Sequence, residues 1–253
     1  MIKERKKKFQ TKKPKNFPPK ERSHNIKNKI KIKPPKKCDV VVLIGQSNSA
    51  NSVLSKVYYP DKHLNYFNKN YYLLANTALG ANGERESIAP AIANKIKSQK
   101  PIIFLTNGWG GTSIYDWSHP ESLLTSFVRK NILDLIKSHL LKYIIWIQGE
   151  SDNNLDINYV KEFNNFRENL FKGIDKKDYE KTKFIITQTS VCNSDRDIHL
   201  NNQQKQLAKK KNFFVTEVTD NLDINYRFDN CHFNKFGTEV IALELAKIIN
   251  KNK

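Results

Sequence analysis

Four short polar clusters hold the side chains of this sequence that are best suited to chemistry. They are Gly45-Gln46-Ser47-Asn48, Gly108-Trp109-Gly110-Gly111-Thr112-Ser113, Gln148-Gly149-Glu150-Ser151-Asp152 and Asp229-Asn230-Cys231-His232-Phe233. A serine hydroxyl is a poor nucleophile until a base removes its proton, and a histidine can act as that base. Asp229 precedes His232 by three residues, so one short turn can present both side chains. The carboxylate can then hold Nδ1 of the ring and leave Nε2 to face a serine.

Each cluster taken alone also has an ordinary structural explanation. Ser47 follows a β-branched run, where a strand-to-helix turn would expose its hydroxyl beside N–H groups able to donate to an oxyanion. Serine is equally a common helix N-cap. Asp229 can be a simple turn residue, and the paired glycines of the second cluster can form a turn or let a ligand approach the backbone. Gln148 and Glu150 follow an apolar run and can serve a site or cap the next helix.

The elements that must position these clusters alternate along the chain. Apolar, β-branched runs predict buried strands at 39–44, 101–106 and 143–148, with further strands at 71–75, 184–188 and 213–216. Helices are predicted at 47–56, 88–97, 121–141, 159–171, 201–210 and 238–249. This alternation predicts an α/β fold, a three-layer α/β/α sandwich with a central, mainly parallel sheet.

In such a sheet the carboxyl ends of the strands meet at one edge, where the connecting loops build the site. The first three clusters should therefore lie together. The fourth stands just before the last helix, where a returning loop can reach the same edge. Two longer irregular stretches, 57–87 and 107–120, should border the site.

In their joint order the clusters resemble the SGNH/GDSL hydrolase superfamily, and within it the branch of sialate O-acetylesterases and acetyl-xylan-type carbohydrate esterases. The matching residues are Gly45-Gln46-Ser47-Asn48, Gly110-Gly111-Thr112-Ser113-Ile114 with Trp117, Trp146-Ile147-Gln148-Gly149-Glu150-Ser151-Asp152, and Asp229 with His232-Phe233. The resemblance runs from residue 39 to about residue 250. It implies the SGNH, flavodoxin-like form of the α/β sandwich.

The resemblance also implies a role for each matching position. Ser47 would be the nucleophile, His232 its base and Asp229 the acid that orients the base. The oxyanion hole would combine the N–H of Ser47, the N–H of Gly110 and the side-chain amide of Gln148. Gly111 is the alternative to Gly110.

Three further residues are expected to support this machinery. Glu150 is the alternative to Asp229 as the orienting acid, or else positions the nucleophile loop. Gln46 and Asn48 flank the nucleophile. No metal ion and no organic cofactor is expected to take part.

The activity implied is a serine ester hydrolase that removes O-acetyl or other short acyl groups through an acyl-enzyme. Its substrate and partner would be an acetylated carbohydrate, such as sialic acid or a polysaccharide. The alternatives are an acetyltransferase on the same scaffold and a non-catalytic carbohydrate-binding protein, and the intact set of polar residues argues against the second. The oligomeric state is not predicted.

The strong positive charge of the chain is concentrated at its start. Residues 1–37 carry sixteen Lys or Arg and two Glu, a net charge of +14 out of +19. So charged and apolar-poor a segment cannot offset its ordering entropy, which predicts a disordered tail at 1–37 and an esterase domain at 38–253. The tail is either a solvated leader or an electrostatic arm for an anionic polymer or a membrane surface. No specific nucleic-acid module is expected.

The three cysteines, Cys38, Cys192 and Cys231, are odd in number and lack metal-ligand spacing. They predict no disulfide framework and a reducing compartment, with Cys231 a free thiol that packs as a small apolar side chain. The basic start is not followed by an apolar stretch typical of a signal peptide or a membrane span. A cytoplasmic location is therefore the default expectation.

Overall fold

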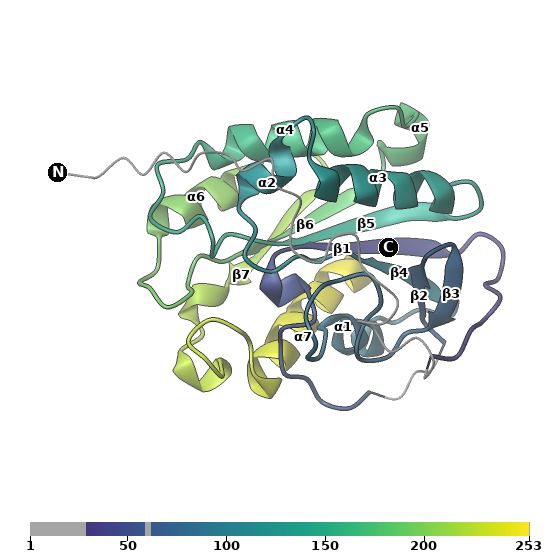
Figure 1. Ribbon diagram of the computed structural model, residues 1–253, viewed down its shortest axis with the longest axis horizontal. Helices are drawn as coiled ribbons and strands as arrows, with labels where there is room; N and C mark the ends of the chain where they lie inside the picture. The colour runs from purple at the N-terminus through teal and green to yellow at the C-terminus, as the bar shows by residue number, and fades with distance from the viewer. Residues whose placement is uncertain (1–28, 59–61, 253) are drawn as a thin grey trace.

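A seven-stranded sheet forms the centre of the molecule (Figure 1). The computed structural model describes residues 29–58 and 62–252. The strands are β1 (Asp39–Gly45), β2 (Leu64–Phe67), β3 (Asn70–Leu73), β4 (Ile102–Thr106), β5 (Leu140–Ile147), β6 (Lys183–Gln188) and β7 (Phe213–Val218). Their order is β3-β2-β4-β1-β5-β6-β7. Every neighbouring pair is parallel except the β2–β3 hairpin, which confirms the predicted α/β fold.

Helices cover both faces of the sheet (Figure 1). They are α1 (Ala89–Lys95), α2 (Ile114–Ser118), α3 (Leu123–Leu135), α4 (Tyr159–Phe171), α5 (Lys176–Tyr179), α6 (Ile198–Leu207) and α7 (Lys235–Lys251). Helices α2, α3, α4 and α6 lie over one face, and α1 and α7 lie over the other. None of the helices in the described part of the chain is long and apolar enough to cross a membrane.

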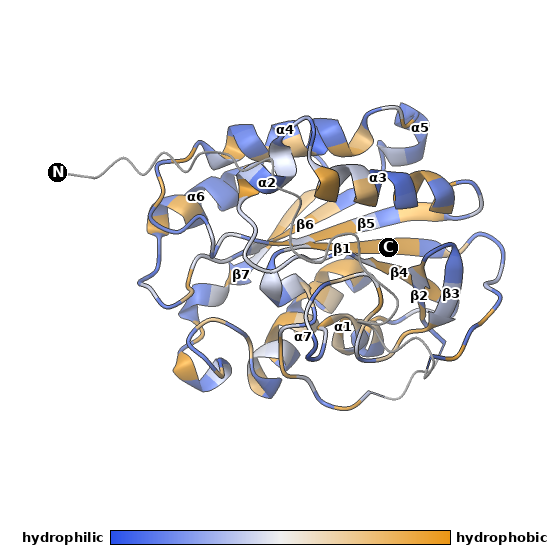
Figure 2. Ribbon diagram, viewed as in Figure 1, coloured by the Kyte–Doolittle hydropathy of each residue, from blue (hydrophilic) through white to orange (hydrophobic). Residues whose placement is uncertain are grey.

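The alternation of side chains along a strand explains why both layers form. In β1, Val40, Val42 and Ile44 enter the core on the side of α3 and α4, whereas Val41 and Leu43 enter the core on the side of α1 and α7. A strand covered on both faces must be apolar throughout, as β1 is. Figure 2 shows the apolar strands enclosed by helices whose outer faces are polar.

The helix predicted at 47–56 does not form. A single 3-10 turn, Ser47–Ser49, follows β1 and the chain then enters a loop. Short polar side chains bind nearby carbonyl groups in place of helix continuation. Ser49 Oγ donates to the Gln46 carbonyl at 2.7 Å, and the Asn51 amide donates to carbonyl groups of the loop after β3.

Two further elements of the structure differ from the predicted pattern. Strand β2 lies inside the stretch predicted to be irregular, and it reaches β3 through a turn in which Asn68 and Lys69 have φ of 48° and 61°. Positive φ at both central residues is typical of a tight hairpin turn. The helix predicted at 121–141 ends at Leu135 because Leu140 already pairs with β1.

Residues 29–37, predicted to be part of the disordered tail, instead border strand β3. Leu73 N–H donates to the Ile30 carbonyl at 2.8 Å, and Ile32 N–H donates to the Tyr71 carbonyl at 2.9 Å. The predicted boundary at residue 37 is therefore wrong for this segment, because its alternating isoleucines find a free sheet edge. The rest of the predicted tail, 1–28, lies outside the described residues, and so does most of the predicted electrostatic arm.

These contacts predict different outcomes for two truncations. The described contacts begin at Lys29, whose ammonium donates to two carbonyl groups after β3 at 2.8 and 3.0 Å and whose pKa burial lowers to about 8. Removal of 1–28 should leave the melting temperature unchanged. Removal of 1–37 should lower it by several degrees, since each kcal/mol is worth about 2–4 °C in a domain of this size. Equal melting temperatures for the two truncated proteins would contradict a structural role for 29–37.

Candidate active site

Three of the four polar clusters follow β4, β1 and β5, which are adjacent in the sheet. The fourth cluster ends where α7 begins. A Cβ atom placed on Gly110 would lie 3.5 Å from Cβ of Ser47, so the second cluster is in direct contact with the first. The sheet thus gathers the first three clusters at one edge, as predicted.

Ser47 stands on a sharp turn that only glycine permits. The preceding Gly45 has φ of +129°, and a Cβ there would lie 2.0 Å from the Ile147 carbonyl oxygen. The chain leaves β1 abruptly through this conformation. The Ser47 N–H falls in the first turn of the 3-10 helix, where backbone donors lack intrahelical acceptors. The Ser47 side chain is nearly buried, with 7% of the residue exposed.

Gln46 fixes the turn that carries Ser47 to the loop after β5. Its backbone N–H donates to the Ile147 carbonyl at 2.9 Å. Its side-chain oxygen accepts from Ser151 N–H at 3.0 Å and from Gly149 N–H at 3.4 Å. Gln46 therefore holds the first and third clusters together.

Asp229 and His232 form the pair that their spacing predicted. Oδ2 of Asp229 lies 2.7 Å from Nδ1 of His232, and Oδ1 accepts from the backbone N–H groups of His232 and Cys231 at 2.8 and 3.2 Å. Burial acts to raise the pKa of Asp229, but these hydrogen bonds and the adjacent imidazole hold that pKa below its usual value. The carboxylate orients the ring and leaves Nε2 available for proton transfer.

Asn48 connects the Asp229–His232 turn to the turn that carries Ser47. Its side-chain oxygen accepts from Phe233 N–H at 3.1 Å, and its Nδ2 donates to the Cys231 carbonyl at 3.3 Å and to Glu150 Oε1 at 2.7 Å. One side chain next to Ser47 thus binds the backbone on both sides of His232. These contacts fix the position of His232 relative to the turn that carries Ser47.

Glu150 is buried, with 6% of the residue exposed, and burial raises its pKa despite the Asn48 hydrogen bond and the nearby charge of Arg227. Oε2 of Glu150 has no hydrogen-bond partner in the described part of the chain. Nδ1 of His232 is bound to Asp229. Of these two carboxylates, Asp229 is the one bound to the His232 ring, and Glu150 binds the Asn48 side chain.

Arg227 is a site residue that sequence reasoning missed. Its buried guanidinium donates to the Cys231 carbonyl at 2.6 Å and to the Thr219 carbonyl at 3.2 Å, and it lies 3.9 Å from Asp220. It also lies over the Phe233 ring, 4.9 Å from the centroid. Arg227 thus supports the loop that carries His232. No local sequence pattern distinguishes it from an arginine exposed to solvent.

The Gln148 amide and the Gly110 N–H, both predicted as oxyanion donors, have hydrogen-bond acceptors within the protein. Gln148 has no exposed surface, and its Nε2 donates to Asp152 Oδ2 at 2.6 Å and to the Thr112 carbonyl at 3.2 Å. Both amide hydrogens thus have acceptors. The Gly110 N–H donates to Asn82 Oδ1 at 2.9 Å. Gly111, the alternative, has φ of +71°, and a Cβ placed on it would have nothing within 4 Å.

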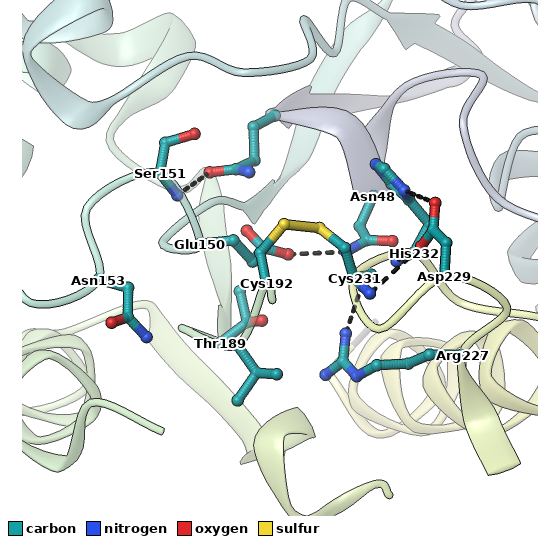
Figure 3. The surroundings of a disulfide bond; sticks show 12 residues. Asn48, Glu150, Ser151, Asn153, Thr189, Cys192, Arg227, Asp229, Cys231 and His232 are labelled. Atoms are coloured by element: carbon teal, nitrogen blue, oxygen red, sulfur yellow. Dashed lines mark hydrogen bonds and ion pairs between the residues drawn. A yellow bond between two sulfur atoms is a disulfide. The ribbon is translucent and has the colours of Figure 1, made fainter. Parts of the chain in front are cut away.

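A disulfide joins Cys192 to Cys231 beside the base (Figure 3). The expectation of free thiols is therefore wrong for this pair, whereas Cys38 is free and buried. Spacing could not reveal the pair, because only the fold brings the loop after β6 against the Asp229–Phe233 turn. Figure 3 shows the bridge next to Asn48 and Glu150, with Arg227 below Cys231 and bound to its carbonyl.

The sheet is mainly parallel, a turn that carries Ser47 follows its first strand, and an Asp-x-x-His turn precedes the last helix, an arrangement typical of the SGNH superfamily. The sequence model of one family, described as carbohydrate esterase, sialic acid-specific acetylesterase, matches residues 37–251. The chain belongs to this family.

The individual relatives share low sequence identity with this chain. The probable carbohydrate esterase At4g34215 of Arabidopsis thaliana is 25% identical over 171 residues, which are 67% of this chain and 64% of that protein. The match thus spans less than two thirds of that relative. The X-ray structure of the Arabidopsis protein has a TM-score of 0.59 at 18% identity and covers 86% of this chain and 99% of its own. The crystal structure of NanS has a TM-score of 0.55 at 14% identity, covering 87% and 98%. Identities this low show a shared fold alone.

The disulfide predicts a defined thiol count and a stability loss. Denatured, unreduced protein should show one free thiol, that of Cys38. Replacing Cys192 and Cys231 with serine should cost about 2–4 kcal/mol of unfolding free energy, because the bridge closes a long loop in the unfolded chain. Denaturant melts of the double variant and of Cys38→Ser, which leaves the bridge intact, measure the difference. Three free thiols in the parent would contradict the bridge.

The two carboxylates predict unequal losses of activity. Asp229→Asn removes the negative charge beside Nδ1 of His232 and favours the wrong tautomer of the ring. The corresponding change lowers kcat about 10⁴-fold in a serine protease. Glu150→Gln keeps an oxygen for Asn48 and should cost less. If Glu150→Gln is the more damaging change, the assignment is reversed.

Proposed function

We propose that the chain is a serine carbohydrate esterase that removes O-acetyl groups, with Ser47 as nucleophile and His232 as general base oriented by Asp229. The observation that supports this most is the Asn48 side chain, which binds the backbone on both sides of His232. Nucleophile and base therefore belong to one rigid unit. Membership of a carbohydrate esterase family supports the choice of reaction.

The reaction proceeds in two halves. Ser47 Oγ attacks the acetyl carbonyl carbon while Nε2 of His232 takes the hydroxyl proton. The electron pair of the carbonyl moves onto its oxygen, and the Ser47 N–H donates to this oxyanion. The sugar alcohol then leaves with the proton from His232, and an acetyl-enzyme remains. Water, deprotonated by the same histidine, releases acetate and restores the serine.

Acetylated sialic acids are the first substrates to test, because the description of the family names sialic acid. Acetylated polysaccharides such as xylan come second, because the Arabidopsis relative is named more broadly as a carbohydrate esterase. An acetate-release assay over both groups ranks them by kcat/KM.

Replacement of Ser47 by alanine tests the nucleophile. The variant should lose roughly 10⁴–10⁶-fold in kcat on p-nitrophenyl acetate, as expected when the attacking group of a serine hydrolase is removed, while its melting temperature stays within a few degrees. Ser151→Ala, in a neighbouring cluster, is the matched control and should retain parent activity.

Three outcomes would contradict the proposal. Activity of the Ser47 variant within a few-fold of the parent would exclude Ser47 as nucleophile. A parent protein that binds acetylated sugars without turnover would be a binding protein. A rate that depends on an added acceptor sugar, with acetylated sugar as the product, would identify an acetyltransferase.

A further inference from the structure

Asn82, in the loop between β3 and α1, binds the cluster that follows β4, and its side chain and Ser47 both lie near Gly110. A Cβ atom placed on Gly110 would lie 3.5 Å from Ser47 Cβ, 3.7 Å from Asn82 Oδ1 and 3.9 Å from Asn82 Nδ2. The Asn82 amide and the serine therefore border the same small space. Asn82 is half-buried, so part of its surface faces solvent at this edge of the sheet.

The orientation of the Asn82 amide follows from its partner. The Gly110 N–H donates to this amide at 2.9 Å, and a backbone N–H can only donate, so the oxygen of Asn82 must face Gly110. The Nδ2 group is then the free end, and it has no hydrogen-bond acceptor among the described residues. An unengaged amide donor beside a nucleophile is suited to bind a developing negative charge.

The backbone of Asn82 is fixed on both sides. Its N–H donates to the Gly108 carbonyl at 3.1 Å, and its carbonyl accepts from Asn51 N–H at 2.8 Å. The loop after β4 and the loop after the nucleophile turn thus hold the residue in place before substrate binds. Such preorganisation is what makes an oxyanion donor effective, since no reorganisation is needed during the reaction.

The Gln148 amide and the Gly110 N–H, which were also predicted as oxyanion donors, are bound to acceptors within the protein. Both hydrogens of the Gln148 amide have buried acceptors, and the Gly110 N–H is bound to Asn82 itself. Of the predicted donors, the Ser47 N–H and the alternative Gly111 N–H remain, and neither is a side-chain donor. The Gly110 hydrogen bond also polarises the Asn82 amide and strengthens its donation from Nδ2, because hydrogen bonds in a chain reinforce one another.

We infer that Asn82 is a catalytic residue that supplies the side-chain donor of the oxyanion hole, and the Gly110 N–H aims it. This inference rests on the proposed esterase function. As Ser47 Oγ bonds to the carbonyl carbon, the carbonyl oxygen gains the electron pair and accepts hydrogen bonds from Asn82 Nδ2 and the Ser47 N–H. When the carbon–oxygen bond to the sugar breaks, the electron pair returns and the oxyanion is lost.

The test is the isosteric variant Asn82→Asp. Aspartate keeps an oxygen that accepts the Gly110 N–H, but it replaces the donating end with a second acceptor. On p-nitrophenyl acetate, kcat should fall about 10²–10³-fold or more, the loss typical of one oxyanion donor, with KM little changed. Asn82→Ala should fall to a similar degree. Inhibition by phenylboronic acid, which forms a tetrahedral adduct with a nucleophilic serine, should weaken in parallel.

Controls separate this proposal from the proposed function and from misfolding. Asn164→Asp on α4 adds the same charge and keeps its acceptor for Lys210, and it should retain parent kinetics. Melting temperatures of all variants report folding. If Asn82→Asp keeps kcat within about five-fold of the parent while Asn82→Ala loses activity, Asn82 is only a support for Gly110 and the inference is overturned. An inactive parent would instead refute the esterase proposal.

Discussion

The hydrogen bonds of Asn48 are the constraint on which the catalytic arrangement depends. They join residues 102 to 185 positions apart in the sequence, linking the turn after the first strand to Glu150 and to the turn before the last helix. Neither turn is a regular element with its own ladder of hydrogen bonds. A nucleophile and a base carried on two such turns would otherwise keep their separation only through the packing of β1 and α7 against the sheet. Because a misplacement of 1 Å can cost about 10²-fold in rate, a direct polar link between the turns has a large effect.

A buried polar network surrounds that link. The Cys231 carbonyl accepts from both Asn48 and Arg227, and the carboxylates of Glu150 and Asp220 lie near the guanidinium of Arg227. Burial lowers the pKa of Arg227, and the two carboxylates act in the opposite direction. Buried charges are tolerated when they are paired and hydrogen-bonded, but loss of one partner is severe. The network supports the loop that carries His232.

The sequence predicted those features that depend on local pattern. Apolar runs placed the ends of β1, β4 and β6 to within one residue, whereas β5 begins at Leu140, three residues before its predicted start. The Asp229–His232 spacing indicated their pairing. Features created by long-range contact were missed. The order of the loops around the site decides that Cys192 meets Cys231 and that Asn82 borders Ser47.

Helix propensity was likewise overridden after Ser47, because short polar side chains bound neighbouring carbonyl groups. The Gln148 prediction placed the residue correctly at the end of β5, but the amide turned inward to Asp152. A position in the fold can be inferred from a motif, whereas the direction of a side chain depends on which partners surround it.

The short pairing of residues 29–37 with β3 has a consequence for association between molecules. Strand β3 lies at the end of the sheet, and an open edge offers unpaired backbone groups to which a strand of another molecule can add. Ile30 and Ile32 occupy those groups, and Lys29 and Lys31 bring positive charge to the same border. The segment thereby covers part of the β3 edge and leaves fewer of its backbone groups open to a strand of another molecule.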